Sequence, residues 1–138
     1  MKKATASIIL FSLIVLSVAW QAKQDPLKNS IAKGKPLYVQ YCLTCHQDDG
    51  SGVPKLNPPL IKTTWVTGDK KKLIKWVLSG STENVPIDGK YYSNNMPPQD
   101  YLQDQDVADI LTYVRNSFGN KGTAVTAAEV KAVRATIK

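Results

Sequence analysis

The segment Cys42-Leu43-Thr44-Cys45-His46 holds both cysteines and the single histidine of this 138-residue chain. If the segment is helical, the three side chains lie at positions i, i+3 and i+4 and project from one face. Two thiols at this spacing can add to the two vinyl groups of one porphyrin, and the imidazole can bind the iron. The CxxCH pattern is typical of c-type haem attachment, so it predicts one haem c, covalently bound through Cys42 and Cys45, with His46 as proximal ligand.

Three other kinds of site can contain a CxxC pair. A structural zinc site normally has four ligands, and the sequence offers no second cysteine pair and no further histidine. A thioredoxin-type dithiol lies at the start of a helix that follows a strand, whereas the residues before Cys42 have helical periodicity. A plain disulfide between Cys42 and Cys45, in which His46 has no role, stays open as an alternative.

The first twenty residues differ in character from the rest of the chain. Lys2 and Lys3 precede an uncharged, mostly aliphatic run from Ala4 to Trp20. A basic start followed by an apolar run of this length is typical of a secretory signal peptide, and it is marginally short for a membrane-spanning helix. Small residues near the end of the run predict a signal peptide at 1–19, with an uncleaved membrane anchor as the alternative. Both interpretations predict export, to the periplasm.

The segment 20–29 is mostly polar and includes Asp25-Pro26, which predicts a short flexible leader before one folded domain at 30–138. The formal net charge of the chain is +7, and it falls to +5 when Lys2 and Lys3 leave with the signal. A modest positive charge suits weak, salt-sensitive docking to acidic protein partners. Nucleic-acid binding is not expected of an exported chain with two arginines.

Hydrophobic periodicity indicates several helices in this domain. A first helix is expected to run into Cys42, with Pro36 either bending it or marking its start. A second is expected over 70–79, between Asp69 and Gly80. A third is expected from Gln103 or Asp104 to Asn116, and a capping-box pattern at 126–129 predicts a short last helix reaching Thr136.

The second predicted helix carries four lysines, Lys70, Lys71, Lys72 and Lys75, opposite its apolar side. Such a cluster can be a docking patch for an acidic redox partner or simply a solvated face, and both interpretations stay open. Further along, the stretch 85–92 predicts a small hairpin or loop around Asp88-Gly89.

Two loops are candidates to complete the iron site. After His46 the chain is dense in turn-forming residues, and the carbonyl of Pro58 or Pro59 can accept a hydrogen bond from the second ring nitrogen of the histidine. A methionine sulfur is a common partner of histidine on haem iron. Because Met1 would leave with the signal, Met96 is the remaining methionine for that position.

Taken together, these segments resemble class I monohaem cytochromes c, especially the bacterial domains that accompany periplasmic dehydrogenases, nitrite reductases and terminal oxidases. The resemblance covers residues 30–134. It is carried by Gly34 and Tyr38, the CxxCH segment, Gly50 to Pro54, Pro59-Leu60, Asp88 to Lys90, Met96 to Pro98, and Ala108 to Asn116.

The resemblance implies a fold and a site. The fold is an all-α shell of three to five helices around one covalent haem, with a small hairpin or loop before the methionine ligand and with the first and last main helices crossing near Gly34 and Tyr113. The haem would be held by Cys42, Cys45, His46 and Met96, with His46 and Met96 on the iron. The proline carbonyl that meets the proximal histidine would be that of Pro59.

The function implied is that of an exported single-electron carrier rather than an enzyme, expected as a monomer, whose partners are a dehydrogenase, a reductase or an oxidase. Two alternatives stay open. The protein can be a haem c subunit docked in a dehydrogenase or oxidase complex, or a gas-binding or peroxidatic haem protein from which Met96 dissociates.

Overall fold

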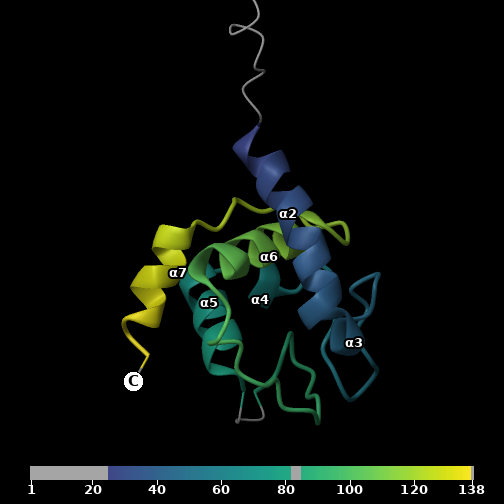
Figure 1. Cartoon of the computed structure of the whole chain (residues 1–138). Helices are drawn as coiled ribbons and strands as arrows, with labels where there is room; N and C mark the ends of the chain where they lie inside the picture. Colours follow the sequence, from purple (N-terminus) through teal and green to yellow (C-terminus); the bar gives the residue numbers. More distant parts are fainter. Residues whose placement is uncertain (1–24, 82–84, 138) are drawn as a thin grey trace, which may run out of the picture.

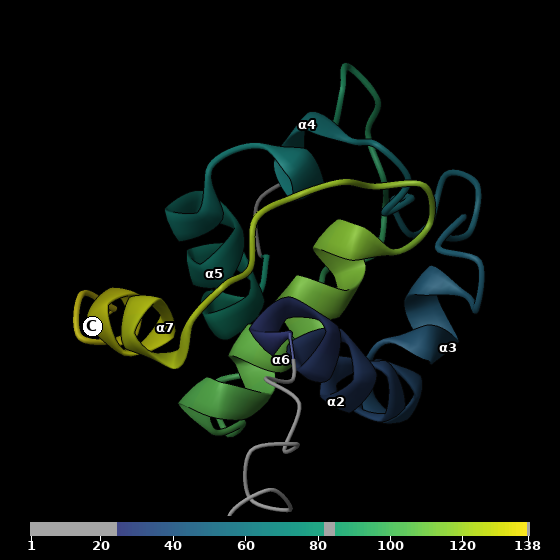
Figure 2. The ribbon, with the colours of Figure 1, turned by 90° about the horizontal axis from the view of Figure 1, so that it is seen from above.

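Two helices from opposite ends of the chain, α2 (Pro26–Tyr41) and α6 (Asp104–Asn116), cross at the centre of the structure (Figure 1). The computed structural model describes residues 25–81 and 85–137. The view from above shows α2 lying across α6 (Figure 2). Gly34 is buried at the crossing, where an added Cβ would lie 2.8 Å from the Cβ of Tyr113. The predicted crossing of these two helices is confirmed.

Helix α2 begins earlier than the sequence suggested. The Asp25 carboxylate accepts a hydrogen bond of 3.0 Å from the backbone N–H of Leu27, and Pro26 occupies the first turn. Asp followed by Pro is therefore a helix start here rather than a turn, since the proline needs no donor at that position. The prediction that residues 26–29 belong to a flexible leader is wrong. The helix is also continuous through Pro36, so it does not start there.

The other two main helices match the predicted boundaries closely. Helix α5 (Lys70–Ser79) is capped by Asp69 and ends at Gly80, whose φ of +69° suits glycine. Helix α7 (Ala127–Arg134) starts with the predicted capping box and ends two residues before Thr136. The single turns α3 (Leu43–His46) and α4 (Thr64–Thr67) are additional to the four longer helices.

The hydrophobic core lies between α2, α5, α6 and α7. Its largest fully buried side chains are those of Tyr38, Val66, Ile74, Leu78, Val107, Thr112 and Val130. Arg115 ties α6 to α4 through this core, because its guanidinium donates hydrogen bonds to the carbonyls of Val66 (2.5 Å) and Gly68 (3.2 Å). These hydrogen bonds of Arg115 therefore hold α4 in place against α6.

The residues described include no extended strand pair, and the predicted hairpin is confirmed as an isolated bridge between Ile87 and Lys90. Asp88 and Gly89 both have positive φ, 48° and 78°, as a type I′ turn requires. The Asp88 carboxylate accepts hydrogen bonds from the backbone N–H and hydroxyl of Thr64, so the hairpin is tied to α4.

Within residues 25–81 and 85–137, no helix combines the length and the apolar character needed to cross a bilayer. The predicted signal peptide at 1–19 lies outside the described residues.

Candidate haem site

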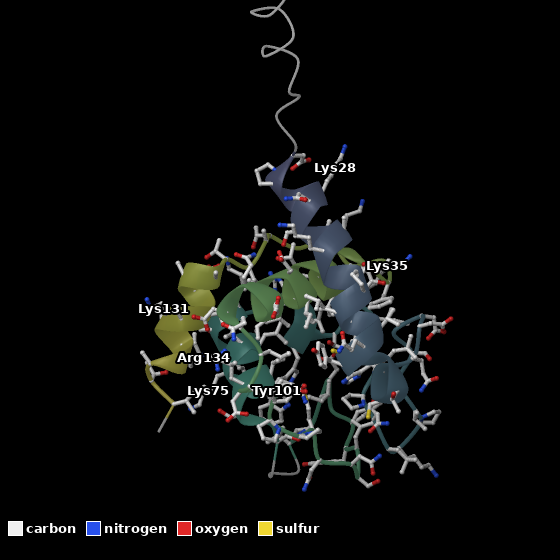
Figure 3. All side chains as sticks on the ribbon, viewed as in Figure 1. Lys28, Lys35, Lys75, Tyr101, Lys131 and Arg134 are labelled. Atoms are coloured by element: carbon white, nitrogen blue, oxygen red, sulfur yellow. The ribbon has the colours of Figure 1, made fainter. Side chains whose placement is uncertain are left out.

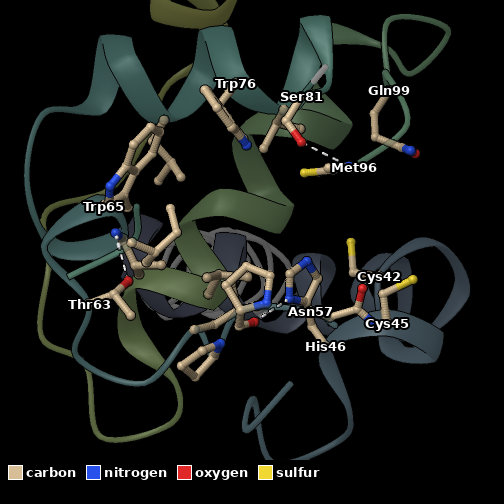
Figure 4. A pocket seen from close by; sticks show the side chains of 18 of the residues that line it. Cys42, Cys45, His46, Asn57, Thr63, Trp65, Trp76, Ser81, Met96 and Gln99 are labelled. Carbon is tan, nitrogen blue, oxygen red and sulfur yellow. Dashed lines mark hydrogen bonds between the residues drawn. The ribbon is translucent and has the colours of Figure 1, made fainter. Parts of the chain in front are cut away.

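A deep pocket opens on one side of the helical shell (Figure 4). Its empty space is about 1260 Å³ when counted out to the open mouth. Its walls are mostly apolar and aromatic, with contributions from α2, α4, α5, α6 and the two loops at 57–60 and 92–99.

The two cysteines lie at one edge of this pocket. Helix α2 ends at Tyr41 and the single turn α3 follows, which brings Cys42 and Cys45 side by side in Figure 4. Both carry free thiols, Cys45 exposed and Cys42 half-buried, so the disulfide alternative is not what the structure shows. Burial, and then the proximity of Cys45, raise the pKa of the Cys42 thiol to about 12, so in the free chain this thiol is protonated at neutral pH.

The surroundings of the pair also disfavour the dithiol and zinc alternatives. The cysteines follow a long helix instead of a strand. Cys42 precedes the single turn α3, but burial raises its pKa, whereas redox dithiols have lowered thiol pKa values. Over the part of the chain that the structure describes, no three cysteine, histidine, aspartate or glutamate side chains gather as zinc ligands would.

His46 is oriented by a main-chain carbonyl. Its Nδ1 lies 3.0 Å from the carbonyl oxygen of Pro58, which makes Nδ1–H the donor and leaves Nε2 free to bind a metal. Burial lowers the pKa of His46, although the bond to Pro58 partly opposes this effect. The imidazole is therefore neutral at physiological pH, which is the form that binds iron.

The carbonyl next to His46 belongs to Pro58 and not to Pro59, which corrects the expectation drawn from the resemblance. The register of the loop decides this: Leu60 N–H donates to the Gly50 carbonyl at 2.8 Å, and a Cβ on Gly52 would lie 2.6 Å from the Pro58 oxygen. Pro59 lines the pocket instead.

Met96 lies across the pocket from His46, as Figure 4 shows. Its loop is fixed at the end of α5, where Ser81 Oγ accepts from the Met96 N–H at 2.9 Å and the Ser81 N–H donates to the Met96 carbonyl at 2.8 Å. Gly80 permits this contact, because a Cβ there would lie 2.5 Å from the Met96 oxygen. The structure therefore brings all four predicted side chains, those of Cys42, Cys45, His46 and Met96, to one pocket.

Several pocket residues were not identified from the sequence. Trp65 and Trp76 pack edge to face with ring centroids 4.6 Å apart, and Lys72 Nζ lies 3.8 Å from the Trp65 centroid. Trp65 belongs to a single helical turn, which is too short to show periodicity. Ser81 was also not identified from the sequence. It directly follows Gly80, which was predicted to end a helix, and this position was a signal that could have been used.

These residues fit a haem c. Two thiols lie at one edge, an oriented neutral imidazole and a thioether sulfur face each other across the pocket, and apolar walls enclose the space between them. When bound, haem c supplies an iron that gains or loses one electron.

Comparison with known proteins agrees with this chemistry. The family described as Cytochrome c matches residues 31–118. The chain is 37% identical over 109 residues to the gluconate 2-dehydrogenase cytochrome c subunit of Pantoea cypripedii, an alignment that covers 73% of this chain and 24% of that protein. It is 35% identical over 107 residues to the fructose dehydrogenase cytochrome subunit of Gluconobacter japonicus, with 74% and 22% covered.

Another relative is of similar size to this chain. Cytochrome c-552 of Thermus thermophilus is 32% identical over 113 residues, which cover 75% of this chain and 86% of that protein. The chain thus spans about a quarter of the length of the dehydrogenase subunits that it matches, and most of cytochrome c-552. On the family match, the helical fold and the CxxCH pocket together, the chain belongs to the cytochrome c family, whose members carry covalently bound haem c.

Proposed function

We propose that this protein is an exported single-electron carrier whose haem c is attached through Cys42 and Cys45 and ligated by His46 and Met96. The observation that carries the proposal is that His46 and Met96 lie on opposite sides of one pocket (Figure 4). When the protein fills both axial positions, the iron has no open position for a substrate, which favours a carrier over an enzyme.

The surrounding residues support this role by limiting movement. Pro58 holds the His46 ring through Nδ1, and Ser81 holds the Met96 backbone by two hydrogen bonds. The mostly apolar lining of the pocket would surround the bound haem, which would keep the local dielectric low. A site whose two ligand segments are both restrained suits the transfer of single electrons.

The test uses the protein purified with its haem. We expect haem to stay with the chain after denaturation, and the ferric protein to show the methionine-to-iron charge-transfer band. Met96→Ala should abolish this band, whereas Tyr91→Ala, a truncation at an exposed position of the preceding segment, should keep it. A wild-type protein without covalent haem, or a band that survives in Met96→Ala, would overturn the proposal.

Export is part of the same proposal and rests on the basic and apolar character of residues 1–19. The expected product is a periplasmic protein whose intact mass corresponds to a chain starting after Ala19 with one haem. A full-length chain recovered with the membrane fraction would instead indicate an uncleaved anchor.

For the partner, we propose an acidic protein surface that docks on the outer face of α5. Lys70 is engaged with Glu129 at 2.5 Å, whereas Lys71, Lys72 and Lys75 are exposed. Lys72 also covers Trp65, which lines the pocket, so this face lies directly outside the pocket wall. Charge complementarity there would speed encounter and weaken with salt.

A second candidate function is that of a haem c subunit within a dehydrogenase complex. The similarity to cytochrome subunits of gluconate 2-dehydrogenase and fructose dehydrogenase favours it. Co-purification with a catalytic subunit at high salt would support this role. Recovery of the protein alone under the same conditions would support a free carrier.

A further inference from the structure

Four hydrogen bonds join the loop at 55–57, which leads into Pro58, to the loop at 93–94, which leads into Met96. The Lys55 carbonyl accepts from the Ser93 N–H (2.9 Å) and from the Ser93 hydroxyl (3.2 Å). The Leu56 carbonyl accepts from the Asn94 N–H at 3.0 Å, and Asn94 Nδ2 donates to Asn57 Oδ1 at 3.1 Å. We call this set, formed by Lys55 to Asn57 and Ser93-Asn94, the mouth clasp.

The mouth clasp connects the surroundings of the two proposed iron ligands. Asn57 directly precedes Pro58, whose carbonyl orients His46. Asn94 is two residues before Met96, and both asparagines are among the residues that line the pocket. The hydrogen bond between Asn57 and Asn94 therefore connects the segment with the Pro58 carbonyl to the segment with Met96. This connection does not pass through the helical core.

The lower half of the clasp is itself a stiff turn. Val53 and Asn57 form a bridge in which the Asn57 N–H donates to the Val53 carbonyl at 2.8 Å and the Val53 N–H donates to the Asn57 carbonyl at 3.0 Å. Gly52, packed against the Pro58 oxygen, fixes this turn on the proximal side. The loop that carries Met96 is thus bonded to a well-defined support.

Met96 is held at two separate places. Ser81, at the end of α5, bonds the Met96 backbone itself, while the clasp restrains the segment just before it. An outward movement of the segment from Asn94 would carry Met96 away from the iron. Loop openings of this kind break the weakest local hydrogen bonds first, because loops are the least stable parts of a fold.

We propose that Asn57 and Asn94 are positioning residues that keep Met96 seated by closing the mouth clasp, and that they slow its replacement by external ligands. This inference rests on the proposed ligation by His46 and Met96. It identifies the mouth clasp as the feature that limits how often Met96 leaves the iron and an external ligand can bind.

The experiment measures how fast imidazole binds to the ferric holoprotein, because imidazole can bind only after Met96 has left. The variants are Asn94→Ala, Asn57→Leu and the double variant. A neutral side-chain hydrogen bond contributes about 0.5–1.5 kcal/mol, so each single variant should bind imidazole about 2–13 times faster. The double variant should be no faster than the faster single variant, because both changes remove the same bond.

Conservative variants separate a specific bond from general loosening. Asn57→Asp keeps an acceptor oxygen opposite Asn94 and should exchange at the wild-type rate. Asn94→Leu removes both the donor and the acceptor and should behave like Asn94→Ala. Asn29→Ala, at an exposed position of α2, is the matched control and should leave the rate unchanged. Melting temperatures recorded for every variant show that each is folded at the temperature of the measurement.

The inference is overturned if Asn94→Ala and Asn57→Leu bind imidazole at the wild-type rate, or if Asn57→Asp accelerates it as much as Asn57→Leu does. Failure of the proposed function is visible separately, because the wild-type protein would then lack a methionine-to-iron band that depends on Met96. If that band is present and the clasp variants exchange normally, the carrier proposal stands and only the role of the clasp is rejected.

Discussion

Gly34 in α2 lies against the main-chain carbonyl of Asp109 in α6, so closely that a Cβ atom at position 34 would lie 2.5 Å from the Asp109 carbonyl carbon. Asp109 is 3% exposed, and its carboxylate also accepts hydrogen bonds from Ser30 in α2 and Gln105 in α6. Asp109 thus fixes both the distance between α2 and α6, through its main-chain carbonyl, and the direction of their crossing, through its side chain. Because α2 leads directly into the CxxCH segment, this crossing positions the haem-binding end of the chain.

Gly34→Ala should therefore destabilise the protein. A methyl group at this contact has to push the two helices apart, and overpacking of this kind costs about 1–3 kcal/mol. We expect the free energy of unfolding to fall by about 2 kcal/mol in denaturant titrations of the holoprotein. Lys33→Ala, at the exposed neighbouring position, should change it by less than about 0.5 kcal/mol.

Cysteine substitutions test covalent attachment. In Cys42→Ala/Cys45→Ala neither thioether can form, so haem should separate from the chain on a denaturing gel, and haem staining of the protein band should be lost. Thr44→Ala changes the exposed residue between them and should retain the stain. Staining that persists in the double variant would contradict attachment through these sulfurs.

Arg115→Met should weaken the wall behind the pocket. The arginine is 4% exposed and donates to the carbonyls of Val66, Gly68 and Thr123. Methionine has similar length but no donor, so three acceptors lose their charged partner. Hydrogen bonds to charged groups contribute about 1.5–3 kcal/mol, and we expect a loss of about 3 kcal/mol in unfolding free energy by chemical denaturation. Lys121→Met, at an exposed position, should be nearly neutral.

The ion pair between Lys70 and Glu129 predicts a pH effect on stability. The bond to Lys70, followed by the backbone and side chain of Thr126, holds the pKa of Glu129 below its ordinary value. A carboxylate with a lowered pKa in the folded state adds stability above its unfolded pKa of about 4.3, and this contribution disappears as the pH falls through the folded value.

Glu129→Gln should isolate that contribution, because glutamine can still complete the capping box with Thr126. Both side chains of the pair are about one-third exposed, so the expected loss at pH 7 is only about 0.5 kcal/mol. At pH 3 wild type and variant should be equally stable in urea titrations. A difference that is the same at pH 7 and pH 3 would show that the charge is not responsible.

The docking face of α5 can be tested with a carboxylate-terminated monolayer on gold as the acidic surface. Lys71→Gln/Lys72→Gln/Lys75→Gln should bind about tenfold more weakly than wild type at low salt, and the difference should shrink as salt is added. The matched control is Lys28→Gln/Lys33→Gln/Lys35→Gln, which removes the same charge from α2; Figure 3 shows Lys28 and Lys35 far from Lys75. Equal weakening in both triple variants would indicate net charge rather than a defined face.

Several features were determined by the sequence alone, because they depend on residues close together in the chain. The CxxCH spacing identified the haem, and the scarcity of methionine left Met96 as the candidate second ligand. Asp69 and Gly80 predicted both ends of α5, and the pattern from Thr126 to Glu129 predicted the start of α7. Caps and turns follow from local hydrogen bonding, so local sequence is sufficient to place them.

Only the tertiary structure decided which long-range contacts complete the site. The sequence does not distinguish Pro58 from Pro59 as the hydrogen-bond partner of His46. The bond between Gly50 and Leu60 is what places the Pro58 carbonyl on His46. The pairing of Asn57 with Asn94 joins segments 37 residues apart, whose side chains carry no local pattern. Which loops meet is set by how the helices pack around Gly34, and that packing depends on the whole chain at once.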